Sequence, residues 1–222
     1  MSCRRSRAVP QCILKRQAAK VVKLLARDYP DAQCALDFKS PLQLLIATIL
    51  SAQCTDKRVN LVVPGLFARY KSAADFARAP LPALEKAIQS TGFFRNKAKN
   101  IKACCQAIME QHDGEVPRNL AALVALPGVG RKTANVVLGT AFGIPSGVVV
   151  DTHVSRIALR LGLTTTTDAV KAESELCSIL PKQEWIDFSH RMIWHGRAIC
   201  EARRPKCDIC SLRKICPRVG VA

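Results

Sequence analysis

Four cysteines close to the C-terminal end limit the possible folds of this chain more than any other feature. Cys200, Cys207, Cys210 and Cys216 follow the spacing C-x6-C-x2-C-x5-C. Four thiolates in so short a segment can surround zinc or a [4Fe–4S] cluster, because both accept four sulfur ligands. Zinc ribbons usually carry two C-x2-C pairs, whereas only Cys207 and Cys210 are spaced in that way. We therefore expect residues 200–216 to form a loop around one metal centre, and the spacing alone leaves the metal open.

The cysteine content also bears on the cellular compartment. The chain has 11 cysteines, an odd number, so they cannot all be paired in disulfides. Its first residues are basic but lead into no apolar stretch, so we expect no secretory signal. A reducing compartment such as the cytoplasm follows, with an organellar or nuclear location still open. The remaining cysteines are expected to be small buried residues: Cys3, Cys12, Cys34, Cys54, Cys104, Cys105 and Cys177.

The charge balance favours nucleic acid as a partner. The chain has 34 Lys and Arg against 17 Asp and Glu, a net charge of +17, and it is 49% hydrophobic. Such a chain can fold around a core and attract polyanions, of which nucleic acid is the commonest. The longest apolar run, residues 44–50, is far shorter than the ~20 residues of a membrane-spanning helix. We therefore expect no membrane contact.

The hydrophobic pattern predicts an all-α protein. Apolar residues recur at three- and four-residue spacing in most windows, and aromatic residues make up only 5%. Ser40, Pro41 and Gln43 resemble a capping box, and the helix that they open, 42–53, is apolar on nearly every side and should be central. Further helices are expected at 12–28, 81–90, 96–112, 120–125, 132–142, 152–161, 168–180 and 185–199. The run 148–150 is too short for a sheet and is interpreted as a buried extended connector.

The segment L-P-G-V-G-R-K-T-A, residues 126–134, predicts a hairpin of two helices. Gly128 and Gly130 allow a tight turn that exposes N–H groups, and the N-terminus of the following helix adds a partial positive charge. Such a turn can hold a DNA phosphate without reading sequence. The alternative is a glycine turn that only joins two packed helices, but the full segment and the net charge of +17 favour the DNA interpretation.

This segment and V-D-T-H-V at 150–154 together resemble the helix-hairpin-helix DNA glycosylases. Among them the chain is most similar to the endonuclease III family, bifunctional glycosylases and abasic-site lyases for oxidised pyrimidines. The resemblance extends from about Leu36 to Cys216. It implies base excision repair of double-stranded DNA that contains oxidised pyrimidines or abasic sites. Near Ser146 and Gly147 the chain has one residue more than the family pattern, so the resemblance does not define the local loop geometry there.

The resemblance assigns two catalytic residues, and the chemistry is consistent with both. Lys132 corresponds to the nucleophile of the family and Asp151 to its partner. A lysine amine can displace a base from C1′ and form a Schiff base, which permits β-elimination of the 3′ phosphate. The alternative for Lys132 is a solvated surface lysine. For Asp151 it is a helix N-cap, a role that is compatible with stabilising positive charge on the sugar.

The same resemblance implies the metal and further DNA contacts. The C-terminal cysteines match the [4Fe–4S] loop of the family, which favours that cluster over zinc. Gln53, in S-A-Q, corresponds to the residue that enters the duplex after base flipping, and Phe93 stands at the wedge position of the family's intercalation loop. Core packing is the alternative for Phe93. Arg131 and His153 are candidate phosphate contacts, with packing an equal alternative for His153.

These observations predict two helical lobes. One lobe, 34–144, carries the hairpin near 120–142, and the other combines 1–33 with 145–222 and the cluster loop. The active site is expected between Lys132 and Asp151, in an enzyme that acts as a monomer. A related adenine-mismatch glycosylase is a rival that lacks this lysine, and a non-catalytic iron–sulfur DNA-binding protein would need neither residue. The presence of both Lys132 and Asp151 favours the lyase.

Overall fold

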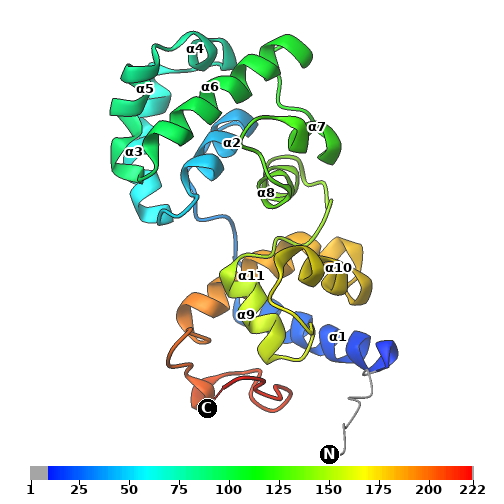
Figure 1. The fold of residues 1–222 in the computed structure, drawn as a ribbon. Coiled ribbons are helices and arrows are strands. Elements are labelled where there is room, and N and C mark those ends of the chain that lie inside the picture. The colour runs from blue at the N-terminus through cyan, green and yellow to red at the C-terminus, as the bar shows by residue number, and fades with distance from the viewer. Residues whose placement is uncertain (1–9, 222) are drawn as a thin grey trace, which may run out of the picture. The chain divides into compact units, whose positions relative to one another are not determined.

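The computed structural model describes residues 10–221, and this part of the chain contains helices and no strand (Figure 1). The helical class predicted from the sequence is confirmed. Two compact units divide the described residues, one formed by 34–146 and the other by 10–33 together with 147–221. In the described residues no helix combines the length and apolarity needed to cross a bilayer.

The unit 34–146 is built around α2, Pro41–Leu50. Every residue from Leu44 to Leu50 is buried, so α2 is the central helix, as its apolar pattern predicts. It packs against α3, α6 and α8 of the same unit. The other helices of this unit are α3 (Asp56–Arg69), α4 (Ala73–Arg78), α5 (Leu81–Ile88), η1 (Gln89–Thr91), α6 (Phe94–Gln111), α7 (Leu120–Ala125) and α8 (Arg131–Phe142).

The start of α2 follows the sequence prediction only in part. The Ser40 hydroxyl accepts a hydrogen bond from the Gln43 N–H at 3.3 Å, which makes Ser40 the N-cap. The Gln43 side chain, however, accepts from the Lys39 N–H at 2.8 Å rather than from that of Ser40. The prediction of a reciprocal capping box between Ser40 and Gln43 is therefore wrong, because the Gln43 side chain bonds to the N–H of Lys39, the residue before the N-cap.

The sequence prediction lacks two α-helices of this unit and misplaces one helix end. It did not predict α3, because Pro64 and Gly65 interrupt the helical pattern, although Thr55 caps this helix and its apolar face is buried. It also missed the six-residue helix α4, which begins with a capping box formed by Ser72 and Asp75. The predicted helix 42–53 ends at Leu50 instead, and Gln53 lies in a turn with φ 51°.

The second unit consists of helices from both ends of the chain. Its core includes Leu25 of α1, Ile157 of α9 and Phe188 of α11, all buried. Residues 148–150 are buried, as the sequence analysis expected, and belong to no helix or strand, and the Val149 N–H donates to Ser189 Oγ at 3.0 Å. The helices of this unit are α1 (Gln11–Asp28), α9 (Thr152–Arg160), α10 (Ala169–Ile179), η2 (Lys182–Glu184), α11 (Trp185–Ala198) and η3 (Cys207–Ile209).

The prediction that the other cysteines are buried was largely wrong. Only Cys104 and Cys105, on the inner face of α6, are buried, and burial raises the pKa of the Cys104 thiol to about 12. Cys12 is exposed, and Cys34, Cys54 and Cys177 are half-buried. Cys3 lies outside the described residues. These positions tolerate a thiol at the edge of the core, which composition alone does not reveal.

Candidate functional site

The predicted hairpin forms from α7, a tight turn and α8. Gly128 has φ +75°, and a Cβ there would lie 2.6 Å from Cβ of Asn100 on α6, so the turn requires glycine on two grounds. Gly130 is the N-cap of α8 and has ordinary extended backbone. Glycine has no side chain that could cap α8, and a helix N-terminus without a side-chain cap suits an anion such as a phosphate.

Lys132 is the second residue of α8, directly after this turn, and its side chain is exposed. Arg131 precedes it as the first residue of the helix and is also exposed. Two cationic side chains therefore follow a helix N-terminus, an arrangement suited to a polyanion. The helix behind Lys132 is anchored by buried Ala134, Val137 and Leu138.

Asp151 lies in the other unit, at the start of α9. It is half-buried, and its Oδ1 accepts a hydrogen bond from the Val154 N–H at 2.8 Å. The capping role that the sequence suggests is therefore present. One carboxylate oxygen is held by the helix, which fixes the orientation of the whole group.

His153 packs within the protein. Its Nδ1 lies 3.2 Å from Nη2 of Arg156, and a Cβ on Gly196 would come within 2.7 Å of the same nitrogen. Burial lowers the pKa of the His153 imidazole, while the Asp151 carboxylate acts in the opposite direction. The structure thus accounts for the packing interpretation of His153, and a phosphate contact stays a prediction.

Gln53 and Phe93 lie in two exposed turns of the unit 34–146. Gln53 lies three residues after the end of α2, and Phe93 is the residue before α6. Both have left-handed backbone, with φ 51° and 47°, which is uncommon for residues other than glycine. Phe93 is 64% exposed, which rules out the core-packing alternative.

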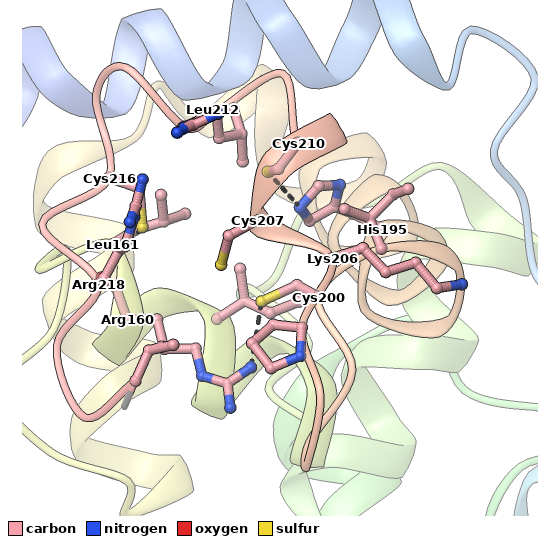
Figure 2. A pocket seen from close by; sticks show the side chains of 15 residues that line it. Arg160, Leu161, His195, Cys200, Lys206, Cys207, Cys210, Leu212, Cys216 and Arg218 are labelled. Carbon is pink, nitrogen blue, oxygen red and sulfur yellow. Dashed lines mark hydrogen bonds between the residues drawn. The ribbon is translucent and has the colours of Figure 1, made fainter.

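The four C-terminal cysteines line one pocket together with apolar residues of α9 and the loop that follows α11 (Figure 2). All four thiols are only half-buried. Among the described residues, no group of three or more His, Cys, Asp or Glu side chains lies close enough to hold a single metal ion.

Two arginines of α9 hold the start of the cysteine loop. Arg160, only 8% exposed, donates to Cys200 Sγ at 3.3 Å and to the carbonyls of Glu201 and Ala202 at 2.7 and 2.8 Å. One turn earlier, Arg156 donates to the Cys200 carbonyl at 2.8 Å. The helix that Asp151 caps therefore also anchors this loop.

A histidine contacts the opposite side of the loop. His195 on α11 is 1% exposed, with Nε2 3.6 Å from Cys210 Sγ and Nδ1 3.1 Å from the Tyr29 hydroxyl. Burial lowers the pKa of His195 to about 4. A neutral imidazole is thus held between a tyrosine and a cysteine sulfur.

Arg156, Arg160 and His195 are not among the residues predicted from the sequence. A usable signal existed for the arginines, which are four residues apart on α9 and thus share one side of the helix. Arg160 also follows Ile157 at helical spacing, on the border of the apolar face. For His195 we find no comparable signal, since its partners come from distant parts of the chain.

Comparison with known proteins now adds to this geometry. Residues 46–182 match the family model HhH-GPD, described as the HhH-GPD superfamily base excision DNA repair protein. Endonuclease III of Synechocystis is 53% identical over 91% of this chain and 93% of its own length. Endonuclease III of Bacillus subtilis is 47% identical over 85% of this chain and 86% of its own. A solved trapped endonuclease III–DNA covalent intermediate has a TM-score of 0.87 at 45% identity, covering 92% of this chain and 96% of that one.

The match to the family model covers more than half of the chain, which places its class among base excision repair proteins with a helix-hairpin-helix. The chain belongs to the endonuclease III family within this superfamily. It is therefore a base excision repair enzyme, with the DNA glycosylase and abasic-site lyase class that the sequence resemblance implied. The adenine-mismatch and non-catalytic alternatives are not favoured.

Proposed function

We propose that this enzyme removes oxidised pyrimidines from double-stranded DNA and cleaves the strand at abasic sites, with Lys132 as its nucleophile. One observation carries the proposal. The exposed Lys132 amine follows immediately after a glycine turn whose helix N-terminus suits a phosphate. A backbone phosphate bound by α8 would therefore bring the adjoining sugar to the amine.

Lysine chemistry supplies both steps of the proposed reaction. Lys132 Nζ attacks C1′, the bond from C1′ to the base breaks, and the base leaves with the bonding electrons and takes up a proton. Opening of the sugar at O4′ then gives an imine between C1′ and Nζ. The imine acidifies the C2′ proton, and its removal expels the 3′ phosphate as the C3′–O bond breaks. A trapped covalent intermediate with DNA, described for a solved endonuclease III, supports a covalent step of this kind.

Asp151 is proposed to assist loss of the base. Its carboxylate is fixed by the Val154 N–H, so it needs little reorganisation to stabilise positive charge that develops on the sugar. It also provides a base for the proton transfers of the amine.

Gln53 and Phe93 are proposed to enter the duplex when the damaged nucleotide leaves the stack. The exposed Phe93 ring can replace lost stacking, and the Gln53 amide has donors and acceptors that suit an unpaired base. The backbone N–H groups of the hairpin turn at Gly128 and Gly130, with Arg131, are proposed to contact phosphates, and His153 to adjoin them.

We further propose that Cys200, Cys207, Cys210 and Cys216 hold a [4Fe–4S] cluster. In such a cluster each thiolate binds a different iron, so the sulfurs surround a larger group than one zinc ion. The common pocket lined by the four thiols suits this arrangement. When bound, the cluster provides a rigid centre around which the loop folds. Arg160 and His195 would contact its ligand sulfurs.

The proposal also covers the setting in which the enzyme acts. We propose a monomer that works on chromosomal DNA in the cytoplasm, as expected for a relative of bacterial endonucleases III. Sedimentation of the purified enzyme with and without a short duplex checks the monomer: a single chain per duplex is expected, and a stable dimer would contradict it.

Borohydride trapping tests the central claim. The enzyme is incubated with a duplex that carries one oxidised pyrimidine, and with duplexes that carry an abasic site or no lesion. Borohydride should reduce the imine and link protein to DNA in the two damaged duplexes only. Peptide mapping should place the link on Lys132. A link to another residue, or no link with either damaged duplex, would overturn the assignment.

A further inference from the structure

A buried lysine joins the two turns that carry Gln53 and Phe93. Lys97, in the first half of α6, is only 4% exposed. Its Nζ donates to the Leu50 carbonyl at 2.7 Å and to the Thr91 carbonyl at 2.8 Å. Leu50 is the last residue of α2 and Thr91 the last of η1, so one ammonium group binds the ends of two helices.

Burying the Lys97 ammonium costs free energy, which its hydrogen bonds to the two carbonyls must offset. Lysine is almost never fully buried, because its charge loses hydration. Lys97 lies in register with Ile101, Cys104 and Ile108, the buried stripe of α6, where an apolar residue would pack without this cost. Backbone carbonyls at helix ends are the acceptors in need of partners, and an ammonium with three donors can serve two of them.

Each of these carbonyls stands just before a strained residue. Gln53 follows Leu50 by three residues and Phe93 follows Thr91 by two, and both have left-handed backbone. The Lys97 N–H also donates to the Phe93 carbonyl at 3.1 Å. The Phe93 turn is thus held on both sides by one residue, and that residue also holds the turn of Gln53. Strain of this kind persists only where the surrounding contacts fix it.

The same stretch of α6 adjoins the hairpin. Asn100, one helical turn after Lys97, packs so closely on Gly128 that a Cβ there would clash. The Gln53 turn, the Phe93 turn and the phosphate-binding turn therefore share one rigid support within a single unit.

We propose that Lys97 is a positioning residue that fixes Gln53 and Phe93 relative to each other, so that both enter the duplex as one element. This inference rests on the proposed roles of Gln53 and Phe93. Extruding a nucleotide costs the free energy of its stacking and pairing. Two side chains held in advance at the correct spacing offset that cost without a further loss of conformational freedom.

The chain provides a matched control for Lys97. Lys102, also on α6, donates through Nζ to the carbonyls of Ala77 and Ala79 at 2.7 and 2.8 Å, near the end of α4. Both lysines belong to α6. Lys97→Met and Lys102→Met each remove one ammonium group that donates to two backbone carbonyls. Only the first change affects the turns of Gln53 and Phe93.

Excision is measured on a duplex with one oxidised pyrimidine, and strand cleavage on a single strand with an abasic site, where no base needs to be extruded. Lys97→Met should slow duplex excision about tenfold and single-strand cleavage by less than about twofold, whereas Lys102→Met should change both by less than about twofold. Melting temperatures of both variants separate a general loss of stability from this split.

A double-mutant cycle gives a readout that general destabilisation does not move. Gln53→Ala, Phe93→Ala and the double variant are compared on the duplex, first with Lys97 and then with Met at that position. With Lys97 the two changes should be coupled, with an effect roughly threefold or more away from additivity. With Lys97→Met they should be additive. If Lys97→Met does not fold, Lys97→Gln, which keeps one donor group, takes its place.

The outcomes separate this inference from the proposed function. If Gln53→Ala and Phe93→Ala each slow duplex excision but Lys97→Met behaves like Lys102→Met, or the coupling survives without Lys97, the inference is overturned alone. If neither alanine variant affects duplex excision, the roles of both residues are overturned and the inference with them. Equal losses on duplex and single strand would reduce Lys97 to a structural residue.

Discussion

Asp151 Oδ1 accepts a hydrogen bond from the Val154 N–H at 2.8 Å, so the carboxylate proposed to act on the sugar is also the N-cap of α9. The same helix carries Arg156 and Arg160, which hold the loop at Cys200. A change at Asp151 can therefore act on the chemistry or on the helix, and a useful substitution must separate these effects.

Asp151→Asn makes this separation. Asparagine keeps a side-chain oxygen that can accept from Val154, so the melting temperature should fall by little. It lacks the negative charge, so excision of an oxidised pyrimidine should slow by at least about 10²-fold. The effect on a preformed abasic site should be smaller, since the base has already left. Single-turnover kinetics on both substrates measure the difference.

Asp168→Asn is the matched control for Asp151→Asn. Asp168 caps α10 through the Lys171 N–H at 2.9 Å, a bond of the same kind in the same unit. Asp168→Asn should lower neither the rate of excision of an oxidised pyrimidine nor the rate of cleavage at a preformed abasic site. An Asp151→Asn enzyme that excises at the unsubstituted rate would leave Asp151 as a cap only.

Lys132→Gln should separate binding from chemistry. Glutamine is similar in length and polar, but it has no amine and cannot form an imine. Borohydride trapping and strand cleavage should be lost, while affinity for a damaged duplex should fall by less than about tenfold, the contribution expected of one exposed cation. Lys171→Gln, an exposed lysine in the first turn of α10, controls for the loss of charge. Trapping that persists in Lys132→Gln would place the nucleophile elsewhere.

Arg160 should govern how firmly the cysteine loop is held. Arg160→Met removes the hydrogen bonds to Cys200 Sγ and to two loop carbonyls while keeping the aliphatic stem. Loss of several bonds to a buried cation should lower stability by about 3 kcal/mol and speed release of iron to a chelator. Visible absorbance follows the release. Arg213→Met is the control, because Arg213 and its partner Asp208 are 51% and 94% exposed. Equal iron release from both variants would contradict a specific role of Arg160.

The sequence predicted best what depends on neighbouring residues. The ends of α7 and α8, the central position of α2 and the cap at Asp151 all follow from local spacing and capping. The helix α3 was missed because Pro64 argues locally against a helix, while burial of its apolar face decides in favour. Tertiary packing outweighed local propensity there.

The functional residues could likewise be predicted only where their partners are close in the sequence. Lys97 stands in an apolar register of α6, which marks it as unusual, but its acceptors at Leu50 and Thr91 come from other elements and cannot be found by periodicity. His195 likewise contacts Tyr29, directly after α1, and Cys210 of the cysteine loop. Residues whose partners are distant in the chain become visible only when the fold is known.

Acid should destabilise the unit that carries the cysteine loop. Burial lowers the pKa of the His190 imidazole, and the Asp187 carboxylate offsets this only in part. The unfolded chain therefore binds a proton near pH 6.5 that the folded chain takes up only at lower pH. The stability contribution is complete above about pH 6.5 and is lost as the pH falls from there toward the folded-state pKa. His153, in the same unit, has a pKa lowered by burial and acts with the same sign.

The two tryptophans of the chain report on this transition. Trp185 and Trp194 both lie on α11, and their indole N–H groups donate to the carbonyls of Leu180 and Gln33 at 3.2 and 3.1 Å, within the same unit. Urea midpoints measured by tryptophan fluorescence should fall between pH 7 and pH 5. His190→Gln should reduce this fall, because it removes one group that must otherwise be kept neutral. The prediction is contradicted if the urea midpoint does not change between pH 7 and pH 5. It is also contradicted if the midpoint of His190→Gln falls with pH as steeply as that of the unsubstituted protein, since His190 would then not couple protonation to unfolding.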